Sequence, residues 1–116
     1  MRPITAEVRE KLSQRIQAIE SQFPKGLAGI VLFGSHARNQ ATLRSDVDLA
    51  FVFTTAESQQ KEDKPMLGAL FEGIFQYLEI DLFCTTVDKL LNTKKRTDAN
   101  YWIREEGDVI WKATHI

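Results

Sequence analysis

Residues 29–53 constrain the fold most, because two short apolar runs flank a polar loop there. The first run covers residues 29–33 and the second covers residues 46–53, where two aspartates open an otherwise apolar stretch. Each run is rich in β-branched or aromatic residues and is bounded by turn residues, which is typical of a buried β-strand. The chain therefore predicts two strands joined by a polar loop.

Asp46 and Asp48 open the second predicted strand. Side chains alternate along a strand, so these two carboxylates point to the same face. Two carboxylates beside an apolar strand are unfavourable unless something neutralises them, and hard oxygen ligands suit Mg²⁺. The pair therefore predicts a metal site. The alternative is a structural role in closing the loop, since Ser-Asp commonly forms turns.

Gly34 and Ser35 end the first predicted strand. Glycine lets a ligand approach the backbone closely, and Ser35 can cap a short helix through Ala37 and Arg38. The N-terminus of such a helix would offer free N–H groups and a partial positive charge to a phosphate. Phosphate and metal sites would then lie at adjacent strand ends, which suits a metal-bound nucleoside triphosphate.

Gly34-Ser35, followed after ten residues by Asp46-x-Asp48, resembles the signature of the DNA polymerase β-type nucleotidyltransferase superfamily. The chain length and the segment GSHARNQATLRSDVDL resemble the minimal nucleotidyltransferases of prokaryotes, as does the ending IREEGDVIW. Many of those proteins are antitoxins paired with a HEPN-domain toxin. Asn39 stands where the family usually has glycine, and asparagine tolerates left-handed backbone better than most residues.

The resemblance implies a third metal-binding carboxylate on a later strand. Asp81 matches it, because it lies between apolar residues in the stretch 78–84, which we predict to be a strand. Glu79 is the rival carboxylate, and a salt bridge is the structural alternative. The resemblance thus implies that Asp46, Asp48 and Asp81 are catalytic and hold one or two Mg²⁺ ions, with Asp81 as a base or only a ligand.

The resemblance also implies which residues contact the nucleotide. Gly34 and Ser35 would hold the phosphates, and Ser45 would meet the nucleotide. Arg38 would either contact the triphosphate or form a structural salt bridge. His36 would approach the phosphates or be an ordinary loop histidine.

The function that the resemblance implies is transfer of AMP from ATP to a tyrosine of a HEPN-domain toxin, typically a ribonuclease, within a hetero-oligomer. Two alternatives remain: a non-catalytic antitoxin that masks the toxin by binding, and a nucleotidyltransferase for small molecules. The acidic triad favours catalysis, because a pure binder has no need of three carboxylates in a metal arrangement.

Composition limits the remaining function classes. The 116 residues suit one domain, residues 1–116, and the net charge of −1 gives no global basic field for nucleic acid. No apolar run approaches the roughly 20 residues of a membrane helix, and the N-terminus lacks an apolar signal region, so we expect a cytoplasmic protein without membrane contact. A single cysteine excludes an internal disulfide.

Periodicity and turn residues predict the other elements. Residues 5–23 carry an apolar stripe at helical spacing, with Thr5 as the N-cap. We further predict a helix after Pro65, a short helix over 87–91 capped by Thr86, a helix capped by Asp98 and ended by Gly107, and a strand over 109–111. This order predicts an α/β domain with a small mixed sheet of about three to five strands, whose helices cover one face.

Overall fold

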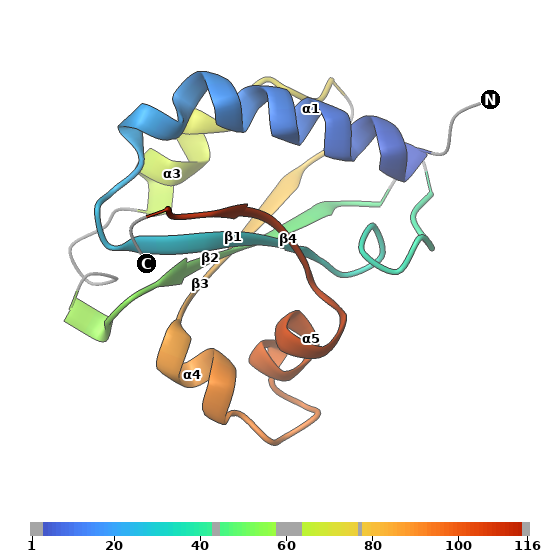
Figure 1. Ribbon diagram of the computed structural model, residues 1–116. Coiled ribbons are helices and arrows are strands. Elements are labelled where there is room, and N and C mark those ends of the chain that lie inside the picture. The colour runs from blue at the N-terminus through green and yellow to red at the C-terminus, as the bar shows by residue number, and fades with distance from the viewer. Residues whose placement is uncertain (1–3, 43–44, 58–63, 77, 115–116) are drawn as a thin grey trace.

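The computed structural model describes residues 4–42, 45–57, 64–76 and 78–114. It is an α/β fold in which helices lie on both sides of a mixed sheet (Figure 1). In chain order the elements are α1 (Ile4–Ile19), the 3₁₀-helix η1 (Glu20–Gln22), β1 (Leu27–Phe33), β2 (Val47–Phe53), α3 (Lys64–Leu70), β3 (Ile80–Thr86), α4 (Val87–Asn92), α5 (Ala99–Glu106) and β4 (Asp108–Lys112). Within the described residues, no helix is long and apolar enough to cross a membrane.

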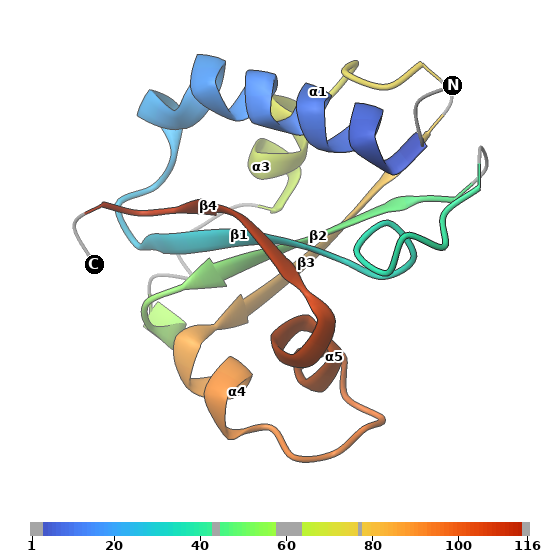
Figure 2. The same ribbon diagram turned by 45° about the vertical axis from the view of Figure 1, so that its right-hand side comes forward.

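The four strands follow the order β3-β2-β1-β4, so β3 and β4 form the two edges (Figure 2). β1 runs antiparallel to both β2 and β4, whereas β2 and β3 are parallel. A parallel pair needs a long crossover, and the chain segment that contains α3 supplies it. The predicted small mixed sheet is confirmed.

The first face of the sheet packs against α1 and α3. The predicted stripe of α1 is buried there at Val8, Leu12, Ile16 and Ile19. These side chains meet alternate residues of the two central strands and the buried residues of α3 and the turn after it, namely Leu27, Ile30, Leu32, Val47, Leu49, Phe51, Phe53, Leu67 and Phe71. The amphipathic pattern of α1 therefore serves the core.

The second face is also covered, so the prediction that helices cover only one face is wrong. Val31, Ala50 and Val52 point to this side and pack with Ile103 of α5, while α4 and α5 lie below the sheet (Figure 1). The physical reason lies in β1 and β2, whose apolar runs are nearly continuous rather than alternating. Strands of this kind are buried on both faces.

Several element boundaries differ from the predictions. Thr5 lies inside α1 and is buried, so it is not the N-cap, and the regular helix ends at Ile19 before η1. β3 spans Ile80–Thr86 rather than 78–84, because it pairs with the whole length of β2. The helix after Pro65 forms as α3 but ends at Leu70.

The caps of the last two helices are as predicted. The Thr86 side chain accepts a hydrogen bond from the Lys89 N–H at 3.2 Å and begins α4. Asp98 accepts from the backbone N–H of Asn100 at 2.9 Å and from its side-chain amide at 3.0 Å. Gly107 ends α5, and the predicted final strand follows as β4. These local signals fix where α5 crosses the second face.

Removing the Asp98 cap is expected to destabilise the protein modestly. Asp98→Ala leaves N-terminal amides of α5 without their side-chain acceptor, which lowers the free energy of unfolding by about 1 kcal/mol. Urea denaturation measures the change. Thr97→Ala, at an exposed neighbour, is the control and should stay within about 0.5 kcal/mol of wild type. Equal stability of the two variants would contradict the capping role.

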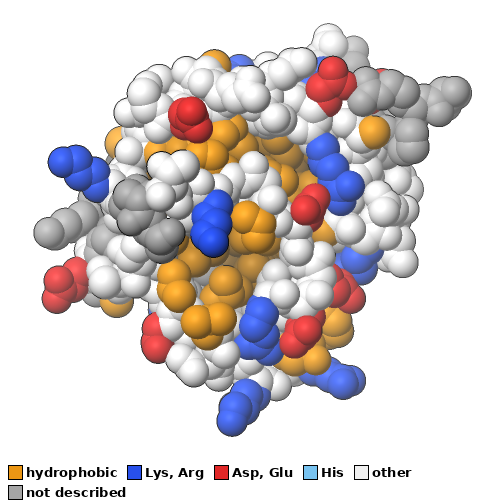
Figure 3. Space-filling model, in the orientation of Figure 1, with side chains coloured by type: hydrophobic (Ala, Val, Ile, Leu, Met, Phe, Trp, Pro, Cys, Tyr) orange, Lys and Arg blue, Asp and Glu red, His pale blue; other side chains and the backbone are white. Residues whose placement is uncertain are grey.

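Apolar side chains remain exposed on the helices and on the edge strand β4. Figure 3 shows apolar side chains gathered between α1 above and α4 below, on the face seen in Figure 1. Among the described residues, the large exposed apolar side chains are Met66, Leu91, Trp102 and Val109, and Val109 is 61% exposed. Association with another chain would remove this exposed apolar surface from water, which is favourable.

Candidate active site

Asp48 and Asp81 stand directly opposite each other on the parallel strands β2 and β3. Asp46 immediately precedes β2 and, two residues before Asp48, belongs to the same side of the strand. Asp48 is half-buried, whereas Asp46 and Asp81 are exposed. The sheet thus brings together the three carboxylates that the sequence analysis singled out.

The environment of Asp48 disfavours its negative charge. Burial raises the pKa of the Asp48 carboxyl above its ordinary value, and the neighbouring charges of Asp81 and Asp46 raise it further. His36 and Arg38 act in the opposite direction and lower this pKa, with smaller effect. The three carboxylates therefore lie within electrostatic range of one another, and a cation placed among them would relieve their repulsion.

The chemistry of this donor set fits a divalent metal ion. Carboxylate oxygens are the hard ligands that Mg²⁺ prefers, and the repulsion at Asp48 gives a cation a reason to bind there. Across the described ranges, however, no three His, Cys, Asp or Glu side chains are already arranged to hold a metal ion. The carboxylates would have to converge when the ion binds.

Glu79, the rival of Asp81, occupies a different place. It precedes β3 and its backbone carbonyl accepts a hydrogen bond from the Val47 N–H at 2.8 Å. Its carboxylate is not among the groups that shift the pKa of Asp48, whereas Asp81 is the first of the charged groups that do. The geometry favours Asp81, whose role as a ligand stays a prediction.

Gly34 brings the backbone against the carboxylate of Asp48. Its φ of 74° lies in the left-handed region, and a Cβ at this position would lie 2.2 Å from Asp48 Oδ2. Any side chain would therefore displace the carboxylate. Asn39 also has a positive φ, of 57°, so asparagine does adopt the left-handed conformation expected at the family's usual glycine position.

The short helix predicted after Ser35 does not form. Residues 34–39 make a series of turns, in which the Arg38 N–H donates to the Gly34 carbonyl at 3.2 Å and the Gln40 N–H donates to the Ser35 carbonyl at 2.9 Å. The chain reverses direction here toward β2, which leaves no room for a regular helix. The helix-dipole argument for a phosphate site therefore falls away, and the Gly34-Ser35 turn itself remains the candidate phosphate contact.

Arg38 and Ser45 have partners within the chain. Arg38 Nη1 lies 3.4 Å from Glu106 Oε2 at the end of α5, and its Nε donates to the Gln40 side chain at 3.2 Å. Ser45 Oγ accepts from the Thr42 N–H at 2.9 Å, which closes the loop. The structural salt bridge of Arg38 is thus observed, and nucleotide contacts of both residues stay predictions.

His36 was considered in the sequence analysis, but its burial was not foreseen. Its side chain is 0% exposed, and its Nε2 lies 3.3 Å from the Ser45 carbonyl oxygen. Its Nδ1 is buried and has no hydrogen-bond partner among the residues that the structure describes. The tautomer with the proton on Nε2 donates to Ser45 and ties the start of the loop to the residue before Asp46. A single histidine in a polar loop has no periodic pattern that would have revealed this burial.

Replacing His36 should loosen the loop. His36→Leu leaves the Ser45 carbonyl without this donor, which lowers the free energy of unfolding by about 1–3 kcal/mol. His36→Gln, whose amide can donate from a similar position, should recover part of the loss. Urea denaturation measures both variants, and a His36→Leu variant as stable as wild type would contradict the contact.

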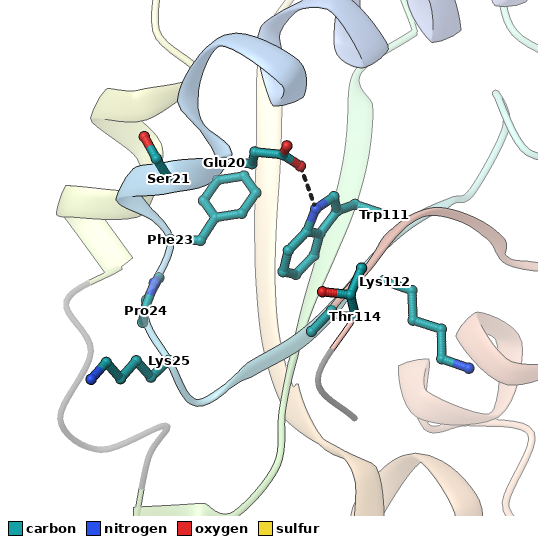
Figure 4. Close-up of a pocket in the computed structure, with 9 residues that line it drawn as sticks. Glu20, Ser21, Phe23, Pro24, Lys25, Trp111, Lys112 and Thr114 are labelled. Carbon is teal, nitrogen blue, oxygen red and sulfur yellow. Dashed lines mark hydrogen bonds between the residues drawn. The ribbon is translucent and has the colours of Figure 1, made fainter.

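A cavity of about 390 Å³ lies away from the carboxylates, between η1 and the end of β4 (Figure 4). Phe23 meets Trp111 edge-on with ring centroids 4.9 Å apart, and Trp111 Nε1 donates to Glu20 Oε2 at 3.1 Å. Its lining contains none of the predicted site residues. The indole N–H already has its acceptor, so we assign this cavity to packing between η1 and β4.

Comparison with known proteins shows the fold and the family of the chain. A crystal structure of a Sulfolobus solfataricus protein assigned as a nucleotidyltransferase shares 17% identity and a TM-score of 0.58, covering 93% of this chain and 83% of that one. A toxin–antitoxin structure with AMP-PNP shares 19% identity and a TM-score of 0.50, covering 92% and 75%. No curated protein matches the chain significantly. The model of the nucleotidyltransferase domain family matches residues 9–110, and the chain therefore belongs to that family.

Proposed function

We propose that residues 1–116 form a single cytoplasmic nucleotidyltransferase domain that acts as an antitoxin. It transfers AMP from ATP, with Mg²⁺, to a tyrosine hydroxyl of a HEPN-domain toxin. The observation that carries the proposal is the pairing of Asp48 with Asp81 across β2 and β3, beside the Gly34 backbone. The family match supports the reaction class, and the fold shared with the toxin–antitoxin structure is consistent with the biological role.

The proposed reaction forms one bond and breaks one. The tyrosine oxygen forms a bond to the α-phosphorus of ATP, and the bond between the α-phosphorus and the oxygen that bridges it to the β-phosphate breaks. Pyrophosphate leaves with that bridging oxygen, and the tyrosine proton passes to solvent. Asp46, Asp48 and Asp81 would hold Mg²⁺, which when bound offsets phosphate charge and lowers the pKa of an attacking hydroxyl.

The remaining residues of the site would bind and orient the nucleotide. Gly34 lets the phosphates approach the backbone, and Ser35 would donate its hydroxyl to them. His36 keeps the loop closed through Ser45, and this fixes the position of Asp46, which precedes β2. Arg38 adds positive charge near Asp48, although it would exchange its contact with Glu106 for a phosphate.

A mass measurement tests the proposal directly. The protein is incubated with ATP, Mg²⁺ and the HEPN-domain protein encoded by the neighbouring gene, and the partner is then weighed by intact mass spectrometry. A gain of one or more AMP units that Asp46→Ala abolishes would support the proposal. Asp88→Ala, an exposed aspartate on α4, is the matched control and should keep the transfer. A stable complex without a mass change would favour an antitoxin that masks its toxin.

A further inference from the structure

An open groove lies between α3 and the edge strand β3. Two cavities of about 340 and 550 Å³ adjoin there, and both are lined by Gly68, Ile80 and Leu82. The first continues along Phe71 and Leu78, whereas the second reaches Asp81. The groove therefore has an apolar floor and reaches one of the three candidate carboxylates, Asp81, at the β3 edge.

We propose that this groove binds the acceptor, as an extended segment of the acceptor protein that lies along β3 and brings a hydroxyl side chain to Asp81. This inference rests on the proposed function, because it assigns the second substrate of that reaction. The acceptor segment would add to the sheet as a further strand beside β3, at the end of the order β3-β2-β1-β4.

The order of the strands places this groove beside the carboxylates, at the edge of the sheet that lies away from the candidate phosphate contact. Gly34, the candidate phosphate contact, comes directly after the central strand β1. Asp48 lies on the neighbouring central strand β2, and Asp81 lies on the edge strand β3. Nucleotide, carboxylates and groove thus succeed one another across the sheet. A second substrate that approaches from the β3 edge meets the carboxylates without crossing the nucleotide.

The edge of β3 suits a peptide strand. Among the described strands, β3 has a neighbour only on its β2 side, and unpaired strand edges readily accept another strand. Ile80 and Leu82 face the α3 side, while Asp81 faces the opposite side. Because side chains of an added strand also alternate, a hydroxyl residue on the Asp81 side would be flanked by residues that enter the apolar groove. The acceptor segment should therefore have an apolar residue on each side of its hydroxyl residue.

Gly68 keeps the groove open. It lies inside α3, where glycine is less favourable than alanine because its backbone loses more freedom on folding. A Cβ at Gly68 would lie 3.3 Å from the end of the Leu82 side chain, Cδ1, which has room to yield slightly. Gly68→Ala should therefore fold normally, whereas a long side chain such as methionine would fill the groove that both cavities share.

Hydrogen exchange on the complex tests the inference. The protein is mixed with the neighbouring HEPN-domain protein and a non-hydrolysable ATP analogue, and backbone amide exchange is followed by mass spectrometry. We expect the amides of β3 to exchange about tenfold or more slowly in the complex, while β4, the other edge, serves as the internal control. A complex that leaves exchange in β3 unchanged, or the absence of any complex, would overturn the inference.

A pair of variants supplies the second test. Gly68→Met should lower the rate of AMP transfer about tenfold or more without changing the affinity for the ATP analogue, and Gly68→Ala should stay within about twofold of wild type. Equal transfer by the two variants would overturn the inference. Protection of β3 in a wild-type complex that transfers no AMP would instead contradict the proposed function and leave the docking site standing.

Discussion

An Asp48→Asn variant is expected to lose the proposed AMP transfer by about 1,000-fold or more. Asp48 lies between Asp46 and Asp81, so its neutralisation removes the central ligand of the candidate metal site. Metal ions contribute several kcal/mol to the stabilisation of charge in such reactions, and each 1.4 kcal/mol is worth tenfold in rate. Intact mass spectrometry of the partner over time measures the rate.

The same substitution should not destabilise the metal-free protein. The pKa of Asp48 is raised in the folded state, so the folded protein binds this proton more tightly than the unfolded chain does. The stability from this group is therefore full below about pH 4 and is lost as the pH rises through the folded pKa. In EDTA at pH 7, Asp48→Asn should melt at or above the wild-type temperature, and the difference should shrink toward pH 4.

A matched substitution distinguishes this effect from a general one. Asp88→Asn removes a carboxylate from the exposed surface of α4, beyond the end of β3 that lies opposite to Asp81, and should leave transfer and the melting temperature close to those of wild type. A large loss of stability in Asp48→Asn at pH 7 would contradict the catalytic assignment and favour the structural role in closing the loop.

Gly34→Ala should be the most damaging single-methyl change in the loop. A non-glycine residue with the φ of 74° found here costs about 1–3 kcal/mol by itself. In addition, the new Cβ would lie 2.2 Å from Asp48 Oδ2, so the carboxylate must move. We expect lower stability in urea denaturation together with a loss of transfer comparable to that of Asp48→Asn.

Gly73 provides the control for backbone strain. Its φ is 80°, but a Cβ there would have nothing within 4 Å. Gly73→Ala should therefore be destabilised only by the unfavourable backbone conformation. The double variant Gly34→Ala/Asp48→Ala removes the clash and should be less destabilised than the sum of its single variants. Additive effects, or equal losses in Gly34→Ala and Gly73→Ala, would show that the contact with Asp48 is unimportant.

Local patterns in the sequence predicted much of the fold. The caps at Thr86 and Asp98, the end of α5 at Gly107 and the stripe of α1 depend on neighbouring residues, and all four are found in the structure. Burial of the second face of the sheet depends on the packing of α4 and α5 against it, which joins residues that are far apart in the sequence. The nearly continuous apolar run of β2 was the sequence signal that could have predicted burial of both faces.

The candidate site shows the same division. Strand alternation placed Asp46 and Asp48 on one face, and the apolar surroundings of Asp81 drew attention to it. The burial of His36 and the closeness of Gly34 to Asp48 arise only when the loop folds back on β2. The helix expected after Ser35 was wrong for this reason, because the closure of the loop overrides the local preference of its residues.

The parallel pairing of β2 with β3 also determines when the site can exist. β1 and β2 are antiparallel neighbours in sequence, so they can pair early, whereas Asp81 reaches Asp48 only after the crossover that carries α3 is complete. A chain still being synthesised therefore lacks the third carboxylate until β3 has emerged and docked. Cleavage within the crossover would likewise sever the covalent link between Asp48 and Asp81, so that only the contacts of β2 with β3 would hold the two carboxylates together.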